Sequence, residues 1–108
     1  MDSHDHAGQR ARRRAARELI AAYHQEQLRA LLEHVREGFV RLDAGELDVF
    51  ELDDLIHRYK RSAQKLWTFC GSGGADWERA VSALKFAREQ GEEPEWWEAG
   101  APRRRQRS

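Results

Sequence analysis

The chain has only two prolines, Pro94 and Pro102, both close to its C-terminal end. Proline removes a backbone hydrogen-bond donor and clashes with the preceding helical turn, so a long run without it permits long helices. The stretch from Arg10 to Gln90 therefore favours helices throughout. With 108 residues in total, the chain forms one domain at most.

Residues 11–42 carry apolar side chains at spacings of three and four, the period of an amphipathic helix, with charged residues outside this stripe. Gly38 lies within the stripe and costs a helix about 1 kcal/mol relative to alanine. The pattern predicts one long helix with a weak point at Gly38. Its apolar positions are Leu19, Ile20, Tyr23, Leu28, Leu31, Leu32, Val35, Phe39 and Leu42.

The segment 43–48 predicts the first turn, in which Gly45 can adopt a positive φ after the helix end. Asp48 and Glu51 have the spacing of a capping box, with Asp in place of Ser or Thr, ahead of a second apolar stripe. The glycine-rich segment 71–74 ends this second helix. A third, shorter helix follows, capped by Asp76 or a neighbour, and Gly91 ends it.

The predicted fold is all-α: a long antiparallel helical hairpin plus a shorter third helix, with disordered N- and C-terminal tails. The expected helices are about 11–42, 49–70 and 76–90, within a three-helix domain at 11–91. Residues 1–10 are expected to be a disordered N-terminus, and residues 92–108 a tail that carries Trp and Arg.

The short turn fixes the register of the hairpin. Folding about Gly45 and Glu46 pairs residues whose numbers sum to about 91, so that Phe39 lies near Leu52, and Tyr23 or Ile20 lies near Trp67 and Cys70. Residues before about Arg17 then have no partner and are expected to project or fray. On the second helix, three basic residues are expected to face water: Arg58, Lys60 and Arg61.

Formal net charge is zero, with 19 basic and 19 acidic residues, so no overall field steers the chain to nucleic acid or membrane. Arginines nevertheless gather at both ends, where they form candidate phosphate contacts of low sequence specificity. Solubilising charge is the competing interpretation. The candidate nucleic-acid residues are Arg10, Arg12, Arg13, Arg14, Arg17, Arg103, Arg104, Arg105 and Arg107.

A second set of residues raises the question of a metal. The acidic stretch from Asp43 fails the pattern of an EF-hand loop. Asp54 and His57 are three residues apart on one predicted helix, and the register places His34 opposite His57. These three residues are candidate metal ligands, but the preferred interpretation is that both histidines flank the apolar seam, without metal or cofactor.

Sequence support for catalysis is weak. Cys70 is the only cysteine, so neither an intrachain disulfide nor a cysteine-based zinc site is expected. It lies at a predicted helix C-terminus, where the helix dipole disfavours a thiolate. The segment Gly71-Ser72-Gly73-Gly74 lacks the Lys-Ser/Thr of a phosphate-binding loop. We expect a protein that is not an enzyme.

Four tryptophans are present, and two of them, Trp96 and Trp97, are adjacent in the predicted tail. Tryptophan is favoured at protein interfaces, so this pair is the candidate partner-binding site, unless it folds back on the chain's own core. With no signal peptide or membrane-length apolar run, the chain is expected to be cytoplasmic. The favoured function is a protein–protein interaction or regulatory module with an unknown protein partner or as a homodimer. Binding of nucleic acid through the arginines and metal binding are the alternatives.

Overall fold

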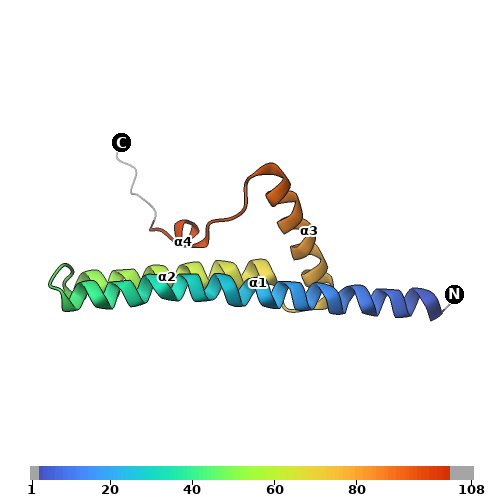
Figure 1. Cartoon of the computed structure of the whole chain (residues 1–108), viewed down its shortest axis with the longest axis horizontal. Coiled ribbons are helices and arrows are strands. Elements are labelled where there is room, and N and C mark those ends of the chain that lie inside the picture. The colour runs from blue at the N-terminus through green and yellow to red at the C-terminus, as the bar shows by residue number, and fades with distance from the viewer. Residues whose placement is uncertain (1–2, 103–108) are drawn as a thin grey trace. The chain divides into compact units, whose positions relative to one another are not determined.

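The computed structural model describes residues 3–102. Within that range the chain forms four helices and no strand (Figure 1). They are α1 (Ser3–Asp43), α2 (Val49–Cys70), α3 (Gly74–Gln90) and α4 (Trp96–Ala99). The predicted all-α fold, a long α1–α2 hairpin followed by a shorter third helix, is confirmed. No helix in the part of the chain that the structure describes is long and apolar enough to cross a membrane.

The helix boundaries differ from the expected ones at two places. α1 begins at Ser3, so most of the segment expected to be disordered is helical. Nothing in that segment forbids a helix, since it contains no proline and several of its residues, alanine and arginine among them, favour one. α4 was not predicted, because four residues are too few to show a helical period.

Local capping accounts for the turn between α1 and α2. Gly45 has φ +78° and closes α1 with a Schellman motif: the N–H of Gly45 donates to Leu42 O (3.0 Å) and that of Glu46 donates to Arg41 O (2.8 Å). The capping box predicted at the start of α2 is confirmed. The N–H of Glu51 donates to Asp48 Oδ1 (2.8 Å), and the N–H of Asp48 donates to Glu51 Oε1 (2.9 Å).

The N-terminus of α3 differs from the prediction. Its N-cap is Gly73, which makes no side-chain cap hydrogen bond, and Asp76 already lies inside the helix. The Asp76 carboxylate instead accepts a long hydrogen bond from the N–H of Ser72 (3.5 Å). At the other end, Gly91 closes α3 in the left-handed region with φ +71°, as predicted.

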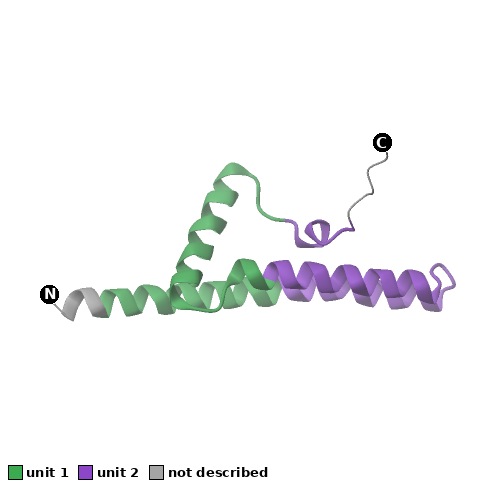
Figure 2. Cartoon of the chain, turned by 180° about the vertical axis from the view of Figure 1, so that it is seen from behind, with its two compact units in different colours: residues 1–26, 67–94 green, residues 27–66, 95–108 purple. Residues whose placement is uncertain are grey.

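The chain divides into two compact units, each with its own core (Figure 2). Unit 1 comprises residues 1–26 and 67–94, and unit 2 comprises residues 27–66 and 95–108. The buried side chains of unit 1 are Ala16, Ile20, Tyr23, Cys70, Ala80 and Leu84. Those of unit 2 are Leu31, Leu52, Ser62, Leu66 and Trp96.

In unit 1, α3 covers the part of α1 that was expected to lack a partner. Ala16 is buried, and Arg13 forms an ion pair with Glu78 of α3 (3.3 Å). The hairpin register holds in this unit, since the rings of Tyr23 and Phe69 lie 6.0 Å apart. The expectation that residues before Arg17 project freely is therefore wrong for Arg13 and Ala16, because α3 returns farther along α1 than helix lengths alone indicate.

In unit 2, the side chains of α2 pack directly on the backbone of α1 at Gly38. A Cβ added to Gly38 would lie 2.9 Å from Leu52 Cδ1 and 3.1 Å from Leu55 Cδ1. The predicted register is therefore confirmed here as well. The residue interpreted as a weak point in α1 has a packing role, because the missing side chain makes room for two leucines.

Candidate functional site

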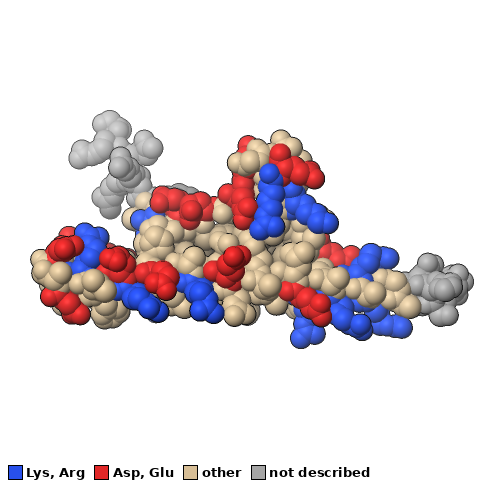
Figure 3. All heavy atoms as spheres, in the orientation of Figure 1, with Lys and Arg blue, Asp and Glu red and all other residues tan. Residues whose placement is uncertain are grey.

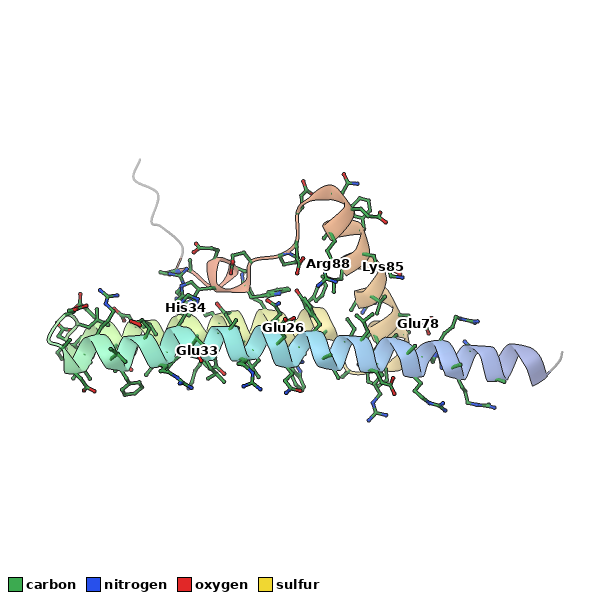
Figure 4. The ribbon with its side chains drawn as sticks, in the orientation of Figure 1. Glu26, Glu33, His34, Glu78, Lys85 and Arg88 are labelled. Atoms are coloured by element: carbon green, nitrogen blue, oxygen red, sulfur yellow. The ribbon has the colours of Figure 1, made fainter. Side chains whose placement is uncertain are left out.

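The two adjacent tryptophans lie against the hairpin of their own unit. Trp96 is only 8% exposed, and Trp97 is half-buried. The imidazole of His34 from α1 stacks on the Trp97 indole, with ring centroids 4.0 Å apart and planes inclined by 2°. The guanidinium carbon of Arg58 from α2 lies 4.3 Å from the centroid of the same indole. Figure 4 shows His34 on the side of α1 towards α4.

Hydrogen bonds from α2 fix the backbone of this segment. Arg58 Nε donates to the carbonyl of Trp97 (3.0 Å), and Ser62 Oγ donates to the same oxygen (3.4 Å). Arg61 Nε donates to the carbonyl of Gly100 (2.8 Å). A charged donor strengthens such a bond in a partly buried setting. We call residues 95–100, which α2 holds in this way, the C-terminal clasp.

The clasp requires glycine at one position. A Cβ on Gly100 would lie 2.6 Å from Ser62 N and 2.8 Å from Ser62 Cα, closer than non-bonded atoms approach. Arg58 is 23% exposed at its side chain and also contacts Glu98 (3.3 Å). The expectation that Arg58 simply faces water is therefore wrong, because the clasp covers that side of α2. Of the two interpretations of the tryptophan pair, folding back on the chain is the arrangement that this structure contains.

Large apolar side chains remain exposed elsewhere on unit 2, near the turn between α1 and α2. Phe50 is the extreme case at 77% exposed. The sequence pattern treated most of these residues as core, and it did not identify them as a site. The sequence did contain a signal for exposed apolar residues, because the apolar stripe of α1 is broader than one antiparallel helix can cover. We call this set the exposed apolar face: Leu32, Phe39, Val40, Val49 and Phe50.

The three candidate metal ligands do not form a cluster. His34 stacks on Trp97, whereas the Nδ1 of His57 lies 2.8 Å from the carbonyl oxygen of Asp53, one turn earlier on α2. Asp54 is exposed on the first turns of α2. Over residues 3–102, no three His, Cys, Asp or Glu side chains are grouped closely enough to hold a metal ion.

The N-terminal arginines lie on α1 in unit 1. Arg10, Arg12, Arg13, Arg14 and Arg17 are all exposed, and Figure 3 shows basic side chains gathered over this end of α1. Arg17 also lies near the Trp77 ring, 5.8 Å from its centroid. The C-terminal arginines, Arg103, Arg104, Arg105 and Arg107, fall outside the described residues.

Cys70 is buried in unit 1, with 1% of its surface exposed. Burial raises the pKa of its thiol to about 11, so the thiolate that would act as nucleophile or metal ligand is scarce near neutral pH. Its role in the fold is that of a small apolar side chain.

Comparison of this chain with protein-family models, curated proteins and solved structures found no match.

Proposed function

We propose that this protein is a non-enzymatic interaction module that binds an α-helical protein surface through the exposed apolar face of unit 2. The observation that carries this proposal is the exposure of five large apolar side chains on unit 2, four of which lie within about one and a half helical turns of the turn between α1 and α2. Isolated apolar residues on a surface are ordinary, but a contiguous group of them marks an interaction site. Phe39 and Phe50 supply the aromatic anchors of such a site.

Helix geometry places the centre of this face on the side of the hairpin away from the clasp. Leu32 precedes His34 by two residues, which is more than half a turn of α1. Val49 precedes Arg58 by nine residues, or two and a half turns of α2. Since His34 and Arg58 contact Trp97, Leu32 and Val49 point away from it. The clasp therefore covers one side of the hairpin and leaves the opposite side open.

A second copy of this chain is the simplest partner for that side, and the charges of α1 and α2 support an antiparallel arrangement. Asp43 and Asp53 lie near the turn, whereas Arg29 lies about four turns before Asp43 on α1 and Lys60 about two turns after Asp53 on α2. In an antiparallel pair of hairpins, the acidic end of each face meets the basic part of the other. Such an isologous contact joins four helices around an apolar centre.

The test is the molar mass of the purified chain over a range of concentrations, measured by light scattering after size exclusion. We expect a concentration-dependent dimer that becomes monomeric in Phe39→Glu. The matched control is Phe86→Glu, which places the same charge at another exposed aromatic residue, in unit 1, and should leave the dimer intact.

A monomer at all concentrations would exclude the second copy. A partner identified by affinity purification should then bind the purified wild type and fail to bind Phe39→Glu. If a purified partner binds both variants equally, the exposed apolar face is not the docking site.

A further inference from the structure

A pocket of about 300 Å³ lies in unit 1, where the end of α2 and the start of α3 meet α1. It is large enough for a small ligand group. Two indole rings, an imidazole and a guanidinium contribute to its walls, together with small and apolar residues. The lining residues are Arg17, Ile20, Ala21, His24, Trp67, Cys70, Gly71, Ser72 and Trp77.

One aromatic side chain of this pocket, Trp67, is unusually open, whereas Trp77 and His24 are half-buried. Trp67 is 62% exposed and meets the His24 ring edge-on, with centroids 5.2 Å apart. Burial lowers the pKa of His24, so this imidazole is neutral at pH 7 and presents a flat, uncharged ring. A tryptophan left so exposed contributes little to the core, but its π-face is available to a planar ligand.

A row of arginines leads to the pocket along α1. Arg10, Arg14 and Arg17 are separated by four and three residues, which places them on one face of the helix, and His24, seven residues after Arg17, lies on the same face. Figure 3 shows the basic side chains that gather over this part of α1. Acidic groups reduce this charge only in part: Glu78 pairs with Arg13, and Glu18 lies beside Arg17 in the sequence.

We propose that unit 1 binds single-stranded nucleic acid, with one base in the pocket against Trp67 and Trp77 and the phosphates along Arg17, Arg14 and Arg10. Aromatic platforms beside a basic track are the recurring solution for binding unpaired strands. A base stacked within a duplex cannot enter such a pocket. Arg10 lies about 10 Å along α1 from Arg17. The phosphate of a mononucleotide whose base fills the pocket would not reach Arg10, so a strand with several phosphates fits these arginines better.

This proposal concerns unit 1 and is independent of the docking face proposed on unit 2. The probe is a fluorescein-labelled 20-mer of deoxythymidine or of uridine, titrated with the full chain and followed by anisotropy. Trp67→Ala should weaken binding roughly 5- to 100-fold, the loss that follows removal of one stacking platform. Phe86→Ala, which removes an equally exposed aromatic ring of unit 1 that does not line the pocket, is the matched control and should bind like the wild type.

The arginines are tested separately by salt dependence. Arg10→Ala and Arg14→Ala should each reduce the slope of log Kd against log salt by about 0.7, as expected for one lost phosphate contact on a single strand. Arg29→Ala and Arg36→Ala, exposed arginines of unit 2, should leave that slope unchanged. If the Arg29 and Arg36 variants reduced the slope as much as the Arg10 and Arg14 variants, binding would rest on diffuse charge attraction. The assignment of the phosphates to the arginines of α1 in unit 1 would then be wrong.

Three further results would overturn the proposal. They are absence of binding at low salt, equal affinity for a duplex of the same length, and unchanged affinity in Trp67→Ala. A mononucleotide that competes as well as the 20-mer would reject the strand in favour of a free nucleotide. Circular dichroism of each variant confirms that the helices are retained, and Trp67→Phe, which keeps an aromatic face, should restore most of the affinity.

Discussion

Gly100 of the clasp lies so close to Ser62 of α2 that no side chain fits between them. The contact joins two positions 38 residues apart, and α2 donors bind the backbone on both sides of it: Arg61 at Gly100 and Ser62 at Trp97. Such an approach of backbone to backbone leaves little tolerance for substitution. The clasp is thus the part of unit 2 where single changes are most informative.

Gly100→Ala should detach the clasp. The added methyl group would overlap with backbone atoms of Ser62, so repositioning Ser62 Oγ cannot relieve the clash. We expect a loss of about 2 kcal/mol in the free energy of unfolding, within the range for overpacking. Hydrogen exchange of residues 95–101 measures the detachment directly.

The control is Gly73→Ala, because nothing lies within 4 Å of a Cβ at Gly73 and its backbone is extended. It should leave exchange in the clasp unchanged. If Ser62→Ala restored full stability to Gly100→Ala, the clash would lie with the hydroxyl alone, contrary to this prediction.

Trp97→Ala should destabilise unit 2 by about 2 kcal/mol. The substitution removes the stack with His34 and the contact with Arg58, each worth roughly 0.5 to 1.5 kcal/mol, as well as buried indole surface. Urea unfolding measures the change, with Phe86→Ala, at an exposed aromatic residue of unit 1, as the control expected within about 0.5 kcal/mol of wild type. A double-mutant cycle with His34→Ala should show coupling; additive losses would mean that the stack contributes nothing.

The capping box offers a local test at the start of α2. Asp48→Ala removes the acceptor for the N–H of Glu51 and should cost about 1 kcal/mol. Asp48→Ser keeps a capping oxygen and should recover most of that loss. Thermal unfolding compares the two variants, and equal melting temperatures for Ala and Ser would contradict a capping role.

His24 should make stability fall in mild acid. Its pKa is lowered by burial in the folded chain, so the unfolded chain, with a pKa of 6.5, binds the proton more readily. The stability contributed by neutral His24 is therefore complete above pH 6.5 and declines as the pH falls below it towards the folded-state pKa. Urea midpoints at pH 7.5 and 5.5 test this.

Replacement of the imidazole isolates its contribution to this pH dependence. His24→Gln should show a smaller loss between the two pH values than the wild type. His57→Gln, at an exposed position beside Asp53, is the comparison variant. An unchanged pH dependence in His24→Gln would assign the effect to other groups.

Local chemistry explains what could be predicted from the sequence. Asp48 and Glu51 act on neighbouring backbone, and Gly45 and Gly91 end helices by their own φ, so these features depend on a few adjacent residues. The hairpin register follows from the length of one turn. These elements therefore agreed with the structure closely.

Contacts between segments far apart in the sequence could not be predicted in the same way. The burial of Ala16 depends on where α3 returns, and the burial of Trp96 depends on a four-residue helix without periodicity. The role of Gly38 as a space for Leu52 and Leu55 depends on the distance between two helices. The exposed apolar face consists of apolar residues that none of these long-range contacts buries. Its residues could therefore be identified only once the structure showed which apolar side chains are buried.

The C-terminal clasp also determines the order in which parts of unit 2 can form during synthesis. Protein synthesis proceeds from the N-terminus, so Arg58 and Ser62 are made 39 and 35 residues before the carbonyl of Trp97 that they bind. A nascent hairpin therefore holds a polar strip open to water until the final segment emerges. The donors of that strip are hydrogen-bonded to water until then, and they exchange water for the carbonyl of Trp97 once residues 95–100 have been made.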